Sequence, residues 1–171
     1  AGLHTAIANP FFSVGVQADL MNSDINALYI SQSGLTMGDR DYYLDPENEN
    51  IRTAYKEYLG KLFRLAGIPE ADIEKAVAGV MNIETKLAEK SWSNTELRDI
   101  PAQYNPTAKA EFEKTYDAID WPAYYKAMGI GDFDTIIVTT KSSIANANDL
   151  MKNAPLEDIR YYLAAQYLDE D

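Results

Sequence analysis

The 171-residue sequence has no cysteine and a single histidine, His4. Without cysteine it can form no disulfide bond, thiolate metal site or cysteine nucleophile, although this does not settle the cellular compartment. Hydrolytic zinc sites commonly need His-Glu-x-x-His on a helix with a further carboxylate, and one histidine cannot supply that set. A histidine-based serine triad is excluded in the same way, and no Gly-x-Ser-x-Gly motif occurs. The chain therefore carries no recognisable hydrolytic centre.

Other absences exclude further classes of function. No apolar run reaches the roughly 18 residues of a membrane-spanning helix, so we expect no membrane contact by this segment. No glycine-rich phosphate loop is present; Gly129-Ile130-Gly131 comes nearest, and the acidic Asp132-Phe133-Asp134 after it favours a helix end and a turn. The spacing of a calcium-binding loop is also missing. We therefore predict no cofactor in this chain.

The charge balance is strongly acidic. Asp and Glu number 27 against 15 Lys and Arg, which gives a net charge of -12. Such a chain repels nucleic acid and anionic lipid surfaces, and its basic residues are scattered, so nucleic acid is excluded as a partner. The composition, 46% hydrophobic and 25% charged, is that of an ordinary globular domain. We expect one domain over residues 1–171, and interpret it as a piece excised from a longer protein.

Two segments near the N-terminus predict a β-hairpin. Apolar and polar residues alternate over residues 12–19, and an apolar stretch at 25–30 follows a polar turn. A later segment, Thr135 to Thr140, is rich in β-branched residues and predicts a third strand. We expect these strands to form a small antiparallel sheet.

The remainder of the chain predicts helices. Asp45-Pro46 opens a helix whose apolar stripe runs from Ile51 to Ala66 and ends at Gly67, and a long helix follows from Pro69 to about Ser91. Four shorter helices are predicted to begin at Thr107, Trp121, Ser142 or Ser143, and Leu156. The predicted fold class is mainly α: a helical bundle with a small antiparallel sheet made of the hairpin and one later strand.

The loop at residues 31–44 concentrates unusual residues. It contains Gly34 and Gly38, the triplet Asp39-Arg40-Asp41 and a pair of tyrosines. The glycines permit backbone angles that other residues avoid, and the charged triplet can bond to nearby backbone groups. We favour an ordered structural loop over a ligand-binding one.

Glu84 is the most unusual single residue, because helical spacing places it on the buried face of the long helix. Burying an unpaired carboxylate costs several kcal/mol. We hypothesise that Glu84 pairs with Arg98 or Arg40 and thereby ties the Arg98-Asp99 loop or the Asp39-Arg40-Asp41 loop to the helix pair. A catalytic carboxylate is the alternative, and it requires a second acid, a base or a metal nearby. The candidate structural residues are Glu84, Arg98, Arg40, Asp39 and Asp41; none is predicted to be catalytic or metal-binding.

Several motifs, in order, resemble the neprilysin-like family of zinc endopeptidases, including the bacterial endopeptidase O type. The first block comprises Asp19-x-x-Asn22-Ser23, Gln32-x-Gly34-Leu35 and Asp39-Arg40-Asp41-Tyr42-Tyr43-Leu44. Later matches include Ile83-Glu84-x-x-Leu87-Ala88, Leu97-Arg98-Asp99 and Leu156-Glu157-Asp158-x-Arg160. The resemblance covers nearly the whole chain. One departure is Met37-Gly38, where family members usually have Leu-Pro.

The resemblance implies a catalytic lobe and a largely helical second lobe that enclose a peptide chamber and exclude folded proteins. This chain is similar to part of the non-catalytic N-terminal helical region. The family's zinc ligands have no counterpart here, so zinc is expected in the catalytic domain of the parent, and the segment should be inactive alone. The implied partners are the catalytic domain of the same polypeptide and peptide substrates.

Two other interpretations stay open. One is a helical binding or scaffold module of an envelope protein without peptidase activity, whose twelve tyrosines recruit a partner. The other is a family member that keeps the fold without the metal. A His-Glu-x-x-His motif beyond Asp171 supports the peptidase. We favour a periplasmic, cell-envelope or secreted location, with a cytoplasmic one still open, and the sequence does not set the peptide specificity.

Overall fold

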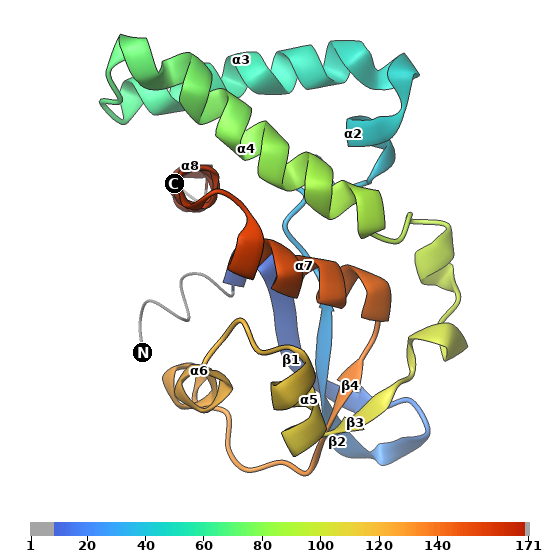
Figure 1. The fold of residues 1–171 in the computed structure, drawn as a ribbon. Helices are drawn as coiled ribbons and strands as arrows, with labels where there is room; N and C mark the ends of the chain where they lie inside the picture. Colours follow the sequence, from blue (N-terminus) through green and yellow to red (C-terminus); the bar gives the residue numbers. More distant parts are fainter. Residues whose placement is uncertain (1–8, 170–171) are drawn as a thin grey trace.

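The structure is a computed structural model that describes residues 9–169, and it consists of a helical layer above a small sheet covered by helices (Figure 1). The helical layer contains α2 (Asp41–Leu44), α3 (Glu49–Leu65), α4 (Glu70–Lys90) and α8 (Leu156–Asp169). The lower part holds the strands together with α5 (Lys109–Thr115), α6 (Trp121–Met128) and α7 (Lys141–Asn153). The predicted class, mainly α with a small sheet, is confirmed.

The sheet has four strands in the order β1-β2-β4-β3. They are β1 (Phe12–Asp19), β2 (Asn22–Gln32), β3 (Pro106–Ala108) and β4 (Thr135–Val138). The predicted hairpin of β1 and β2 is confirmed, with Phe12 opposite Gln32 and an irregularity at Ala18 and Asp19. The expected antiparallel pairing of the later strand is wrong, because β4 runs parallel to β2 and aligns Leu28 with Ile136.

The two differences in the sheet have physical causes. The helices between β2 and β4 form a long crossover that returns the chain in the same direction, and a parallel pair requires such a connection. The extra strand, β3, pairs antiparallel with β4. At three residues, β3 is too short to show a strand period, and it takes the place of the first turn of the helix predicted from Thr107, so α5 begins at Lys109.

The core between the sheet and the helices that cover it is built by alternate residues of the strands and by aromatic residues of the helices. Ile30, Ile136 and Val138 are all 0% exposed, and Trp121 of α6 packs 4.8 Å from the ring of Phe112 of α5. Helix α6 has the predicted ends: the Asp120 carboxylate accepts a hydrogen bond from Ala123 N at 3.1 Å, and Gly129 ends it with a φ of 70°.

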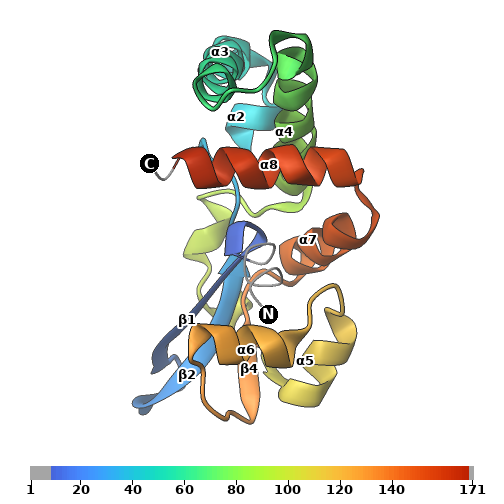
Figure 2. The same cartoon turned by 90° about the vertical axis from the view of Figure 1, so that its left-hand side faces the viewer.

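Helices α3 and α4 form an antiparallel pair, and α8 crosses α4 (Figures 1 and 2). A short 3-10 turn (η1, Pro46–Asn48) precedes α3, and Asp45 caps it by accepting from Glu47 N at 2.9 Å. Tyr55, Leu59 and Phe63 of α3 are buried. The rest of the predicted stripe is more open, because Ile51 and Tyr58 are 41% and 40% exposed. Within residues 9–169, no helix has the length and apolar character of a membrane span.

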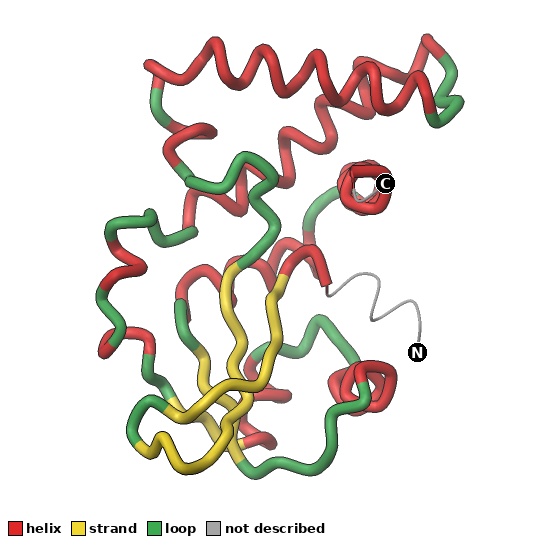
Figure 3. Tube along the Cα trace, turned by 180° about the vertical axis from the view of Figure 1, so that it is seen from behind, coloured by secondary structure: helices red, strands yellow, loops and turns green. Residues whose placement is uncertain are grey.

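The chain after α4 connects the two layers through two short 3-10 turns, η2 (Glu96–Arg98) and η3 (Pro101–Gln103), which run beside the sheet (Figure 3). The side chain of Gln32, at the end of β2, donates to Trp92 O at 2.9 Å and accepts from Trp92 N at 2.8 Å. This two-way contact fastens the end of the hairpin to the end of α4.

One buried hydroxyl in the core generates a prediction. Tyr125 is 6% exposed, and its hydroxyl has no hydrogen-bond partner among the described residues. An unpaired buried hydroxyl is costly, so we expect Tyr125→Phe to raise the free energy of unfolding by about 1 kcal/mol in urea denaturation. The matched control is Tyr162→Phe, which removes a hydroxyl that donates to Gly34 O at 2.9 Å, and should lower stability by about 1 kcal/mol. Equal losses in both variants would contradict this assignment.

Candidate functional site

Glu84 lies where the loop at residues 31–44, called the glycine loop below, meets the helical layer. Its side chain is 0% exposed. One carboxylate oxygen accepts from Thr36 N at 2.8 Å and from the Tyr43 hydroxyl at 2.6 Å, and the other accepts from the Tyr55 hydroxyl. The donors come from the loop, α2 and α3, and the acceptor from α4. One carboxylate thus joins four segments of the chain.

The predicted arginine partner of Glu84 is wrong. Among residues 9–169, no lysine or arginine forms an ion pair with Glu84. Arg40 donates to Ser91 O at 3.1 Å and lies 4.0 Å from the Glu96 carboxylate, and Arg98 is exposed without an ion pair in the described part of the chain. Two tyrosine hydroxyls and a backbone amide satisfy the carboxylate without the cost of desolvating a guanidinium.

The environment of Glu84 also sets its protonation. Burial raises the pKa of Glu84 above its ordinary value of 4.5, against the lowering effect of hydrogen bonds from Tyr43, Tyr55 and Thr36. Burial, followed by the adjacent carboxylate, raises the pKa of both tyrosines well above 10, so their hydroxyls keep their protons and act as donors. These contacts include no second acid or base, and the carboxylate is closed to solvent. The geometry therefore supports a structural role and not the catalytic alternative.

Gly34 explains part of the glycine pattern. It has a φ of +97°, and a Cβ at this position would lie 2.5 Å from the Tyr162 hydroxyl oxygen and 2.7 Å from Pro10 O. Helix α8 grips the loop here through Tyr162, and again through Gln166, which donates to Thr36 Oγ1 at 2.8 Å. Gly38 has a similar φ of +94° but no atom within 4 Å of an added Cβ. Gly34 thus meets a packing constraint, whereas Gly38 serves a turn.

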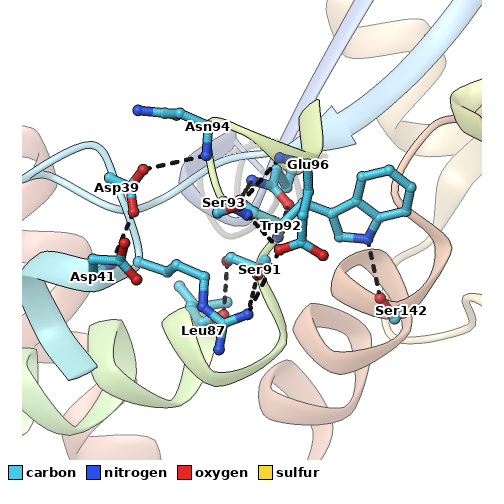
Figure 4. A network of polar contacts seen from close by, with 11 residues as sticks. Asp39, Asp41, Leu87, Ser91, Trp92, Ser93, Asn94, Glu96 and Ser142 are labelled. Carbon is cyan, nitrogen blue, oxygen red and sulfur yellow. Dashed lines mark hydrogen bonds and ion pairs between the residues drawn. The ribbon is translucent and has the colours of Figure 1, made fainter. Parts of the chain in front are cut away.

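The charged triplet makes a second set of contacts, outside the buried cluster (Figure 4). Asp39 accepts from Asp41 N at 2.8 Å and from Asn94 N at 3.2 Å, while Arg40 donates to the carbonyl of Ser91, directly after α4. Asp41 takes part through its backbone amide. The charged triplet therefore ties the loop to the segment that follows α4. The sequence predicted that Arg40 of this triplet, or Arg98, binds Glu84. Reasoning from the sequence missed Thr36, Tyr43, Tyr55 and Tyr162 as partners; the only sequence signal was the pair of tyrosines beside the triplet.

The described residues offer a groove but no metal site. A groove of about 870 Å³ is lined by residues of α3 and α4, among them Ile73, Val77 and Met81 and charged residues of both signs. Within residues 9–169, no group of three His, Asp or Glu side chains could hold a metal ion, and His4 lies outside the described residues. These residues do not suit zinc.

The close packing at Gly34 predicts a large mutational effect. Gly34→Ala should lower the free energy of unfolding by about 3 kcal/mol, because it combines a positive φ with clashes against a backbone carbonyl and a tyrosine. The control, Gly38→Ala, has the same backbone strain in open space and should cost about 1 kcal/mol. Urea denaturation measures both, and similar losses would show that the Gly34 contacts carry no energy.

Glu84 predicts a pH dependence of stability. Its pKa in the folded state lies above 4.5, so its contribution to stability is full below about pH 4.5 and is lost as the pH rises through the raised pKa. Glu84→Gln stays neutral, accepts from Thr36 and Tyr43 and can donate to Tyr55. Relative to this variant, the unfolding free energy of the wild type should fall with rising pH, by at most about 1.4 kcal/mol per pH unit.

Urea denaturation from about pH 4 to about pH 8 measures this difference. Glu84→Leu is the control: like Glu84→Gln it does not titrate, and it leaves three donors without an acceptor, so its curve should run parallel to that of Glu84→Gln and about 3 kcal/mol below it. Parallel curves for the wild type and Glu84→Gln would contradict the raised pKa.

The sequence and the fold of this chain are similar to those of known enzymes. Endothelin-converting enzyme 1 of Mus musculus is 32% identical over 151 residues, which cover 85% of this chain and 20% of that protein. The zinc metalloprotease Zmp1 of Mycobacterium tuberculosis, in its open state, has the same fold with a TM-score of 0.85 and 23% identity, over 96% of this chain and 26% of Zmp1. PepO from Lactobacillus rhamnosis aligns with a TM-score of 0.78 and 15% identity, over 97% of this chain and 28% of PepO.

The chain thus spans about a fifth of the length of the curated relatives it matches. A family model of N-terminal regions, Peptidase_M13_N, described as Peptidase family M13, matches residues 1–170. The resemblance to neprilysin-like endopeptidases is confirmed, including the assignment to the N-terminal region. The chain belongs to peptidase family M13, whose N-terminal region it represents.

Proposed function

We propose that this chain is a non-catalytic segment of a zinc metalloendopeptidase and forms part of the wall of its peptide-substrate chamber. The observation that carries the proposal is the match of residues 1–170 to the N-terminal family model, over a chain whose described residues contain no metal-ligand cluster. The zinc and its catalytic chemistry then belong to the catalytic domain of the same polypeptide. Residues 1–171 act as one unit of the helical lobe.

The contacts around Glu84 suit the role of a wall. A wall that excludes large substrates must keep its shape, because steric exclusion supplies no chemistry of its own. The loop at residues 31–44 donates a hydrogen bond to Glu84 of α4 and accepts hydrogen bonds from Tyr162 and Gln166 of α8. Hydrogen bonds between Gln32 and Trp92 join the sheet to the helical layer. These links make the two layers resist relative movement.

The alternative of a tyrosine-rich binding module loses its main support. Seven of the twelve tyrosines are buried, among them Tyr43, Tyr55 and Tyr162, which serve the core and the Glu84 cluster. Of the others, Tyr42, Tyr58 and Tyr167 are 36% to 70% exposed and lie on three different helices. The buried tyrosines are closed to a partner, so fewer than half of the twelve could take part in recognition.

The proposal predicts how activity divides between the segment and its parent. The purified 171-residue chain should cleave no peptide, whereas the full polypeptide should cleave short peptides in a chelator-sensitive way. Chelator-resistant cleavage by the segment alone would refute this account.

Size selection gives a second readout in the full polypeptide. Gly34→Ala loosens the junction, so it should lower the ratio of kcat/KM for a short peptide to that for a long unstructured one, by about threefold or more. Gly38→Ala should leave the ratio within about twofold of the wild type. If the ratio is unchanged in both variants although Gly34→Ala is destabilised, the packing around Gly34 plays no part in substrate selection.

A further inference from the structure

Strand β1 presents an open hydrogen-bonding edge. It is the first strand in the order β1-β2-β4-β3, so β2 pairs with one of its two edges and the other edge faces away from the sheet (Figure 2). Apart from pairing with β2, the one hydrogen bond to its backbone among the described residues is that from the Tyr29 hydroxyl to Ala18 O, at 3.1 Å. An edge strand leaves the N–H and C=O groups of alternate residues pointing outward, where they can pair with another extended chain.

Within the part of the chain that the structure describes, this edge lacks the features that usually prevent such pairing. Proteins protect edges with proline, with charged residues, with bulges or with a covering element. Residues 12–18 contain no proline and no charge, although the whole chain has a net charge of -12. The irregularity of the strand is confined to its last step, at Ala18 and Asp19. Seven consecutive residues of regular, uncharged strand are therefore available.

The strand is also complementary to itself. If two copies of β1 run antiparallel with Gly15 opposite Gly15, Val14 of each copy faces Val16 of the other on one side of the sheet. Val16 is 65% exposed and Val14 already packs partly against the core, so this pairing covers an apolar side chain that β1 leaves open. Ser13 faces Gln17 on the opposite side. In this register Asp19 faces Phe11 of the second copy, so no like charges meet.

We infer that β1 is an interface for a second copy of this chain, formed by antiparallel pairing across a two-fold axis at Gly15, so that two four-stranded sheets become one. The inference is independent of the proposed chamber wall. It rests on the open edge, the uncharged sequence and the self-complementary register.

Sedimentation of the 171-residue chain tests the pairing. As its concentration is raised to about 1 mM, the wild type should approach a mass of about 38 kDa, twice the 19.1 kDa of one chain. Gly15→Lys places two ammonium groups face to face at the axis, and should raise the dissociation constant by about 100-fold. The substitution leaves the fold intact, because no atom lies within 4 Å of a Cβ added at Gly15. Circular dichroism verifies this.

A charge swap separates pairing from misfolding. Gly15→Glu alone should also be monomeric, and an equimolar mixture of Gly15→Lys and Gly15→Glu should restore a dimer containing one copy of each. Gly131→Lys is the matched control, since Gly131 is exposed with equally open space, and it should dimerise like the wild type.

Three results would overturn the inference. They are a wild type that stays at 19.1 kDa, a dimer that survives Gly15→Lys, and a mixture that fails to pair. If the wild type is monomeric and its β1 amides gain protection from hydrogen exchange only in the full parent polypeptide, another segment of the parent pairs with β1 in place of a second copy.

Discussion

The structure depends on the burial of one carboxylate. Glu84 is 0% exposed on α4, where an unsatisfied acceptor costs several kcal/mol. Its two oxygens must therefore find donors, and the backbone amide of Thr36 and the hydroxyls of Tyr43 and Tyr55 supply them. Satisfying this group fixes where the glycine loop, α2 and α3 lie relative to α4. The polar cluster thus specifies an arrangement that apolar packing alone leaves looser.

The second constraint is the close approach of α8 to the loop. Gly34 has a positive φ and no room for a side chain, because the Tyr162 hydroxyl and Pro10 O occupy the space of a Cβ. Glu84 and Tyr162 hold the loop at two points, through the amide of Thr36 and the carbonyl of Gly34. Zmp1 shares the fold at 23% identity, so these elements tolerate wide change in sequence while keeping their arrangement. Hydrogen bonds to the backbone suit such tolerance, since they constrain the loop's path more than its side chains.

Local patterns predicted the elements whose physics is local. Alternation over residues 12–19 predicted the hairpin, and the start at Trp121 and the end at Gly129 of α6 were both predicted, because caps and strand periods act within a few residues. The predicted apolar stripe of α3 is longer than the part of it that is buried, because Ile51 and Tyr58 are exposed to solvent. The direction of β4 and the existence of β3 escaped prediction, because pairing between distant strands depends on the path of the whole chain.

The sequence by itself determined that Glu84 is buried, since helical spacing among apolar neighbours leaves its side chain no route to water. It also determined family membership, through motifs that occur in a fixed order. The tertiary structure alone decided which groups satisfy the carboxylate. Arg40 and Arg98 carry the complementary charge, yet Arg98 is exposed and Arg40 is half-buried against Ser91 O, and desolvating a guanidinium costs more than using hydroxyls that are already buried. Which donors converge depends on how α2, α3 and the loop fold over α4, and no local pattern records that.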